Sequence, residues 1–205
     1  MKILVKICGL TSHEAVEAVV QAGADIAGFV FAESPRQVTP ERAVQLAEGL
    51  PDDIPPVAVM RHPSEQDTAQ VLRVFRPAFL QTDWQDFGLI LLSDTTRPLP
   101  VLRSGRPTPL KMPRLVLFEG PVSGSGETID WDAAAILARQ TNMVLAGGLN
   151  PDNVGDAIRQ VRPYGVDVSS GVESEPGIKD PDLIVRFVEA VREAQTAIAI
   201  HGEAQ

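Results

Sequence analysis

Cysteine and histidine are both scarce in this chain of 205 residues. The single cysteine, Cys8, excludes an internal disulfide framework and a cysteine cluster that holds zinc. The three histidines, His13, His62 and His201, are too scattered along the sequence to suggest a metal site. We therefore predict no metal site, and we expect the protein to reside in the reducing cytoplasm.

Positive charge and long apolar runs are also lacking. The chain has 18 lysines and arginines against 27 aspartates and glutamates, and its net charge of −9 argues against a nucleic-acid or anionic-membrane partner. No apolar run reaches the roughly 18 residues of a membrane span, and the first residues show no signal-peptide pattern. The composition is that of a globular protein, and we expect a small-molecule partner and a monomer or homodimer.

Short apolar segments alternate with helical patterns along the chain. Apolar runs without clean alternation are typical of strands that are covered on both faces. We predict eight, at residues 3–8, 25–31, 56–60, 78–81, 98–103, 114–119, 142–146 and 165–169. This order predicts an α/β protein whose parallel sheet closes into a single-domain (β/α)8 barrel, the TIM barrel.

Helix starts are marked by capping residues and prolines. The run from Thr11 to Glu14 has the spacing of a capping box. Other predicted caps, most of them followed by a proline suited to the first helical position, are Thr39, Asp130, Asn150 and Asp180.

Two segments are expected to lack regular packing. Residues 105–113 contain three prolines in nine positions, so the fifth helix should be short or absent. Residues 198–205 show no packing pattern and should form a frayed tail, which leaves residues 1–197 as the barrel domain.

Reactive side chains gather at the predicted carboxyl ends of the strands, where active sites of this fold lie. Cys8 ends the first strand and shares a strand face with Lys6, whose ammonium would favour the thiolate. The alternative is a small buried hydrophobe, but lysine is a poor neighbour in an apolar core. Asp167, on the eighth strand, should point into the barrel and pair with Lys6, because a buried carboxylate needs a partner.

Arg36 follows Ser34 and Pro35 in the loop after the second strand. Its guanidinium suits a planar carboxylate, which it can hold by two parallel hydrogen bonds. A surface ion pair is the alternative role.

Glycines cluster after the seventh and eighth strands. Glycine lets backbone N–H groups approach an anion, and these loops of such barrels often hold a phosphate. Tight turns alone are the alternative, but neighbouring serine hydroxyls add donors. We predict a phosphate bound by Gly147, Gly148, Ser169, Ser170 and Gly171.

Taken together, these segments resemble the phosphoribosylanthranilate isomerase family of tryptophan biosynthesis. Each matching segment is weak alone, but they occur in order from residue 6 to residue 180. The matching segments are Lys6–Leu10, Gly28–Phe31 with Ser34–Arg36, Gly124–Gly126 with Asp130–Trp131, Leu145–Leu149, and Val166–Glu173 with Pro176–Asp180.

The resemblance implies an Amadori rearrangement of N-(5-phosphoribosyl)anthranilate that needs no metal or organic cofactor. It implies that Cys8 is the general base and that Glu119, at the end of the sixth strand, is the general acid. Arg36 would hold the anthranilate carboxylate, and Gln81 and Asp167 would bind substrate. To act as the acid, Glu119 must carry a proton, and we expect burial or a nearby anion to favour it.

Two positions depart from the family pattern. Glu119 stands where the family has an aspartate and reaches one methylene further. After the fourth strand the family has Gln-Leu-His-Gly, whereas this chain has Gln81-Thr-Asp-Trp84, so Asp83 replaces a histidine.

Two other functions stay open from the sequence. A histidine-pathway isomerase on the same barrel would be expected to have an aspartate where Cys8 stands. A catalytically silent barrel could bind a phosphorylated ligand without turnover. Asp130 is the alternative acid if Glu119 does not serve.

Overall fold

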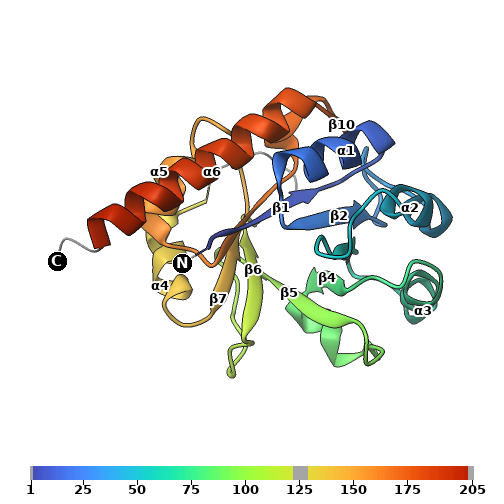
Figure 1. Ribbon diagram of the computed structural model, residues 1–205. Helices are drawn as coiled ribbons and strands as arrows, with labels where there is room; N and C mark the ends of the chain where they lie inside the picture. Colours follow the sequence, from blue (N-terminus) through green and yellow to red (C-terminus); the bar gives the residue numbers. More distant parts are fainter. Residues whose placement is uncertain (1, 122–128, 203–205) are drawn as a thin grey trace.

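Eight parallel strands form a closed barrel in the computed structural model, which describes residues 2–121 and 129–202 (Figure 1). All eight predicted strands are confirmed, with ends that differ by no more than two residues. They are β1 (Leu4–Cys8), β2 (Ile26–Val30), β3 (Pro56–Val59), β4 (Phe79–Asp83), β5 (Arg97–Arg103), β6 (Leu115–Glu119), β7 (Asn142–Leu145) and β8 (Gly165–Val168). The barrel closes where β1 pairs with both β2 and β8.

Helices lie outside the barrel, and α6 crosses beside α1 and α5 (Figure 1). They are α1 (His13–Ala22), α2 (Pro40–Ala47), α3 (Glu65–Val74), α4 (Trp131–Ala138), α5 (Val154–Val161) and α6 (Pro181–Gly202). A 3-10 turn, η1 (Trp84–Gly88), connects β4 to β5, and residues 104–114 connect β5 to β6 without a helix. The predicted loss of the fifth helix is thus confirmed. No helix in the described part of the chain combines the length and hydropathy of a bilayer-crossing segment.

Most predicted caps are confirmed, and two are wrong. The side chains of Thr39, Asp130 and Asp180 accept hydrogen bonds from backbone N–H groups in the first turns of α2, α4 and α6. For α1 the cap is Ser12, whose Oγ accepts from the Ala15 N–H, rather than Thr11.

Thr11 has a different role, because its hydroxyl donates to the carbonyl of Gly177 across the mouth of the barrel. Asn150 caps only a preceding turn, through the N–H groups of Asp152 and Asn153. Helix α5 begins later, at Val154.

The end of α6 also differs from the expectation. The helix continues past residue 197 to Gly202, and Ile198 packs against the core. Residues 203–205 lie outside the described part of the chain.

Two apolar layers support the barrel. The larger one lies between the sheet and the helices and includes Ile7, Phe29, Leu80, Leu102 and Phe187. The smaller one fills the barrel itself and comprises Ile26, Val57, Phe79, Leu99, Val101, Leu117, Val144 and Ala146. Side chains two positions beyond this inner layer therefore point into the carboxyl-end mouth of the barrel.

A β-hairpin follows β8 and contributes to this mouth. The 3-10 turn η2 (Ser170–Val172) leads into β9 (Glu173–Glu175) and β10 (Ile178–Lys179), which pair with each other. Gly177 in this hairpin adopts a left-handed conformation, and an added Cβ would lie 2.4 Å from the Pro35 carbonyl oxygen. The hairpin therefore packs directly on the loop after β2.

Asp25 ties the opposite end of the barrel together. Its carboxylate accepts from the Val5 N–H and pairs with Lys2 and Arg192. Burial alone would raise the pKa of Asp25, but these hydrogen bonds outweigh it and lower the pKa.

We predict that Asp25→Asn lowers the free energy of unfolding by about 2 kcal/mol at pH 7, the scale of charged hydrogen bonds. Because the pKa is lower in the folded state, this contribution is present above the unfolded value of about 4 and disappears as pH falls through the folded value. Chemical denaturation at pH 7 and pH 3 should show the two proteins converging in acid. The exposed Asp53→Asn is the matched control, and equal losses at both pH values would contradict the prediction.

Candidate active site

The buried ion pair predicted between the first and last strands is confirmed. Lys6 and Asp167 are directly paired in the register of β1 and β8, and Lys6 Nζ lies 2.6 Å from Asp167 Oδ1. Lys6 is only 1% exposed. Burial lowers its pKa, but Asp167 and Cys8 outweigh that effect and raise it, so the lysine stays charged inside the barrel.

Cys8 lies beside this pair at the end of β1. Gly28 on β2 makes the space: a Cβ there would lie 3.2 Å from Cys8 Sγ and 3.3 Å from Lys6 Nζ. The thiol is buried, at 6% exposure, and burial raises its pKa. Lys6 and Lys179 lower that pKa and Asp167 raises it, with burial the largest cause. Lys6 thus favours the thiolate, as expected from the sequence, but burial outweighs it and the pKa of Cys8 stays raised.

Arg36 is held by a carboxylate from the β9–β10 hairpin. Its Nε and Nη2 donate to the two carboxylate oxygens of Glu173 at 2.7 and 2.8 Å. Lys179, on β10, donates to the same carboxylate at 2.5 Å. The Arg36 side chain also lies against Gly9, where a Cβ would come within 2.6 Å of its Cδ. The guanidinium is thus fixed near Cys8 by Glu173, a residue for which no role was predicted from the sequence.

The two predicted phosphate loops are brought together. Gly171 packs so closely on the loop after β7 that a Cβ would lie 1.9 Å from the Leu149 carbonyl oxygen. Gly147 and Gly148 both have positive φ, and within the described residues their backbone N–H groups have no hydrogen-bond acceptor. Such N–H groups are suited to an anion.

Ser169 is used differently from the expectation. Its hydroxyl donates to the Cys8 carbonyl at 3.0 Å and so links β8 to β1. The Lys179 amine approaches the Ser169 carbonyl at 3.0 Å. Ser169 therefore does not offer its hydroxyl proton to a phosphate in this structure, which leaves Ser170 as the hydroxyl of this pair that is without a partner among the described residues.

Gln81 points into the barrel from β4, on the same strand face as Phe79. It is 6% exposed, and within the described residues its Oε1 is buried without a hydrogen-bond donor. A buried polar atom without a partner is costly. The unpaired oxygen is therefore a candidate acceptor for a donor group of a ligand.

Glu119 ends β6, on the same strand face as Leu117, and Arg103 of β5 lies against it. Arg103 Nη1 donates to Glu119 Oε1 at 2.7 Å, and Arg103 Nε donates to Asp83 Oδ1 at 2.7 Å. An ion pair forms with the ionised carboxylate, whereas a general acid must carry a proton. The predicted protonation of Glu119 by burial or a nearby anion thus overlooked Arg103. The following segment Ser123–Gly126 lies outside the described residues.

Three comparisons with known proteins agree on one family. The model of N-(5'-phosphoribosyl)anthranilate isomerases matches residues 108–190. The isomerase of Streptococcus mutans is 40% identical over 191 residues, which is 92% of this chain and 98% of the relative. That of Streptococcus pneumoniae strain Hungary19A-6 is 41% identical over 92% of this chain and 95% of the relative. The chain belongs to the phosphoribosylanthranilate isomerase family.

Solved structures of the family share this fold. TrpF from Jonesia denitrificans superposes with a TM-score of 0.81 and 34% identity over 95% of this chain and 98% of that one. A phosphoribosylanthranilate isomerase solved with reduced 1-(o-carboxyphenylamino)-1-deoxyribulose 5-phosphate has a TM-score of 0.74 and 29% identity over 94% of this chain and 100% of that one.

This family member differs from the expected pattern at β4, and the structure shows what occupies the position. Asp83 is a buried strand residue that contacts Arg103 and, through Oδ2, His62 Nε2 at 3.1 Å. His62 comes from the loop after β3, and its Nδ1 lies 3.1 Å from Asp86. This cluster could not be recognised from the sequence, because His62 follows β3, whereas Asp83 and Asp86 lie at and after the end of β4.

The same cluster is the one to examine for a metal in this isomerase. His62, Asp83 and Asp86 bring three potential ligand atoms within 4.8 Å of one another. Arg103 already neutralises Asp83, and the Thr82 hydroxyl donates to Asp86 at 2.5 Å. A guanidinium beside the site repels a cation, so the contacts favour a network of ion pairs.

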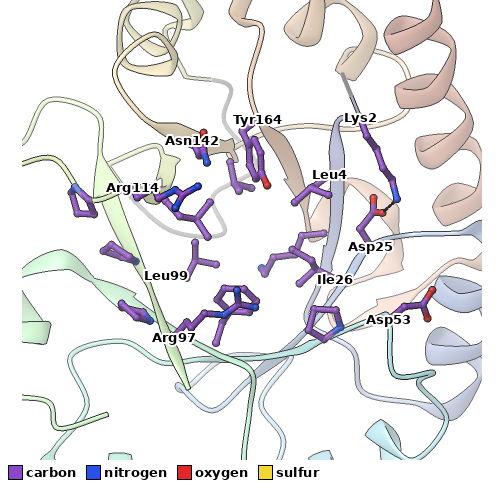
Figure 2. Close-up of a pocket in the computed structure, with 18 residues that line it drawn as sticks. Lys2, Leu4, Asp25, Ile26, Asp53, Arg97, Leu99, Arg114, Asn142 and Tyr164 are labelled. Atoms are coloured by element: carbon purple, nitrogen blue, oxygen red, sulfur yellow. Dashed lines mark ion pairs between the residues drawn. The ribbon is translucent and has the colours of Figure 1, made fainter. Parts of the chain in front are cut away.

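A large cavity lies at the other end of the barrel. It has a volume of about 780 Å³ and opens between the starts of the strands, where Figure 2 shows Arg97, Arg114 and Tyr164 around an apolar floor that includes Leu4 and Leu99. Catalytic side chains of this fold are found at the carboxyl ends. The carboxyl-end mouth that holds Cys8, rather than this cavity, is therefore the candidate active site.

Because burial raises the pKa of Cys8, we predict slow alkylation of this enzyme by iodoacetamide at neutral pH. The midpoint of the rate against pH should lie above that of a free thiol such as N-acetylcysteine, since the thiolate is the reactive form. Cys8 is the only cysteine, so mass spectrometry reports it directly, and Cys8→Ser measures background. A midpoint below that of the free thiol would contradict the prediction.

Proposed function

We propose that this chain catalyses the Amadori rearrangement of N-(5-phosphoribosyl)anthranilate to 1-(2-carboxyphenylamino)-1-deoxy-D-ribulose 5-phosphate in tryptophan biosynthesis. Relatives at 40–41% identity, matched over nearly their whole length, are isomerases of this substrate. The observation that carries the proposal is the position of Cys8, next to Gly9 on which Arg36 lies and linked through Ser169 to the loop after β8, whose Gly171 packs on the loop of Gly147 and Gly148. One mouth thus combines a thiol with groups suited to a phosphate and to a carboxylate.

Substrate binding uses the two anionic ends of the molecule. The backbone N–H groups of Gly147 and Gly148 hold the phosphate, with Ser170 and Gly171 beside them. Ser169 shapes this loop through its hydrogen bond to Cys8. Arg36, with Glu173 fixing one edge of its guanidinium, directs its remaining N–H groups to the anthranilate carboxylate. Fixing the guanidinium in advance reduces the entropy lost on binding.

Further contacts would fix the sugar. Gln81 Oε1 accepts a hydrogen bond from a substrate hydroxyl, which satisfies a buried oxygen that otherwise lacks a donor. Asp167 holds Lys6 at the floor of the site and keeps its positive charge near the thiol.

The reaction needs one acid and one base. Glu119, in its protonated form, gives a proton to the ribose ring oxygen, and the C1–O bond breaks to leave an iminium ion at C1. Cys8, as the thiolate, removes the C2 proton, and the electrons of that C–H bond form the enolamine. Tautomerisation then gives the ketone. The iminium is the electron sink, so these steps use only protein side chains.

Electrostatics shape both groups. Cys8 begins as a buried thiol, and Lys6 and Lys179 provide the positive charge that stabilises its thiolate. Glu119 shares Arg103 with Asp83, so neither carboxylate has the guanidinium to itself. A substrate iminium near Cys8 further stabilises the thiolate as the reaction proceeds.

Assembly and location belong to the proposal as well. Structural neighbours include monomers made from a dimeric isomerase of Thermotoga maritima, and we infer a monomer or homodimer here. A free, unpaired thiol fits a cytoplasmic enzyme.

Cys8→Ala should abolish turnover. Loss of a general base lowers kcat by about 10²–10⁴-fold, whereas affinity for the reduced product analogue should stay within a few-fold. The decrease in substrate fluorescence measures turnover. Ser93→Ala, the same loss of one side-chain atom near the opposite end of the barrel, should keep the wild-type rate. Wild-type protein that binds the analogue without turnover would favour the silent barrel instead.

Glu119→Gln should lower kcat by about 10²-fold or more with little change in KM, because the amide cannot give up a proton. Asp130→Asn provides the matched comparison. Asp130 caps α4, so its loss should reduce thermal stability and leave kcat near wild type. The reverse outcome, an active Glu119→Gln and an inactive Asp130→Asn, would assign the acid role to Asp130.

A further inference from the structure

Two carboxylates compete for one guanidinium at the mouth of the barrel. Arg103 of β5 lies between β4 and β6 and donates to Asp83 and to Glu119, each at 2.7 Å. Both carboxylates are largely buried, with side chains 6% and 14% exposed. A change in the Asp83 contact therefore changes how tightly Arg103 holds Glu119.

His62 binds the other side of Asp83. Its Nε2 lies 3.1 Å from Asp83 Oδ2, and its Nδ1 lies 3.1 Å from Asp86 Oδ1. Only the imidazolium form donates from both ring nitrogens. The contacts thus form one chain from Asp86 through His62, Asp83 and Arg103 to Glu119.

The backbone places His62 in this position at some cost. Its φ is +44°, in the left-handed region that residues other than glycine rarely adopt. Strained residues persist where the surroundings hold them. Here Asp83 and Asp86 hold the imidazole ring of His62, although 59% of this side chain is exposed.

Charged groups are crowded in this cluster. Three carboxylates, on Asp83, Asp86 and Glu119, lie around Arg103 and His62. The exposed Arg106 lines a small cavity together with His62, Asp83 and Arg103. Among the carboxylates, Glu119 is the one that the proposed reaction needs in the protonated form.

We propose that Asp83 and His62 are positioning residues that control, through Arg103, whether Glu119 carries the proton it donates. The inference rests on the proposed acid role of Glu119. Asp83 draws the guanidinium away from Glu119 and adds negative charge, and both effects favour the acid form. His62 pairs with the other carboxylate oxygen of Asp83 and so offsets part of its negative charge. Neither residue needs to touch the substrate.

The contacts of Asp83 and His62 predict that their removal shifts an apparent pKa of the kcat–pH profile in opposite directions. In Asp83→Asn, Glu119 no longer shares Arg103 with the Asp83 carboxylate and a negative charge nearby is lost, so one apparent pKa of the kcat–pH profile should move down and kcat at neutral pH should fall several-fold. In His62→Gln a positive charge is lost, and the same apparent pKa should move up. Each shift should be about half a pH unit, the scale for a charge several ångströms away in a partly solvated site. The other apparent pKa, which belongs to Cys8, should stay in place, and KM should change less than about two-fold.

Matched controls separate this effect from general damage. His13→Gln and Asp156→Asn replace an exposed histidine and an exposed aspartate outside the site, and their profiles should match wild type. If Asp83→Asn does not fold, Asp86→Asn should give a smaller shift of the same sign. His62→Gln is expected to fold, because most of the side chain is exposed.

The outcomes distinguish the two proposals. Profiles that coincide with wild type, or shifts of the same sign in both variants, would overturn the positioning role while leaving the isomerase intact. Wild-type protein without turnover would overturn the proposed function. An active Glu119→Gln variant would remove the acid role and this inference with it.

Discussion

The ion pair between Lys6 and Asp167 joins the first and last strands at the point where the barrel closes. Both residues are buried and directly paired in the strand register. Removing one partner of a buried pair leaves an uncompensated charge, which typically costs about 3–5 kcal/mol. The pair therefore affects the site as well as the closure of the barrel. It places a permanent positive charge beside Cys8 and defines where the reactive end of β1 sits relative to the phosphate loop after β8.

A second layer of charges extends from that pair toward the surface. Glu173 accepts from Arg36 and Lys179, and Lys179 also reaches the Ser169 carbonyl. Burial would raise the pKa of Glu173, but Arg36 and Lys179 outweigh it and lower the pKa. The carboxylate thus stays ionised and connects the loop after β2 to the loop after β8. A strand end, two loops and a hairpin are held in one arrangement by three charged residues.

The sequence predicted best what depends on neighbouring residues. The strands were predictable from short apolar runs, and the Lys6–Asp167 pair followed from strand periodicity, because residues two apart share a face. The loops after β7 and β8, which pack on each other, were recognisable from glycines at strand ends, and their phosphate role stays a proposal. The helix cap was harder to predict where two neighbouring residues could serve. Ser12 rather than Thr11 caps α1, and the Thr11 hydroxyl donates to the Gly177 carbonyl.

The contacts of Glu119 were beyond such rules. Arg103 contacts it directly, Asp83 contacts Arg103, and His62 contacts Asp83, and only the closed barrel brings these residues from separate parts of the chain together. A histidine absent from its expected place after β4 is matched by one that arrives from the loop after β3. By sequence the histidine at this position is missing, whereas the structure shows that the imidazole of His62 contacts the same end of β4.

The proposed acid and the proposed base of this barrel are controlled by different physical means. The proton affinity of Cys8 is governed mainly by burial, with Lys6 and Lys179 as counter-charges. The proton affinity of Glu119 depends on Arg103, which it shares with Asp83. Asp83 in turn contacts the half-exposed ring of His62. A reaction that gives one proton and takes another needs two groups with different proton affinities in one site. The thiol is controlled by residues of β1 and β8, and the carboxyl by residues that surround Arg103. The protonation of one group can therefore change without disturbing the other.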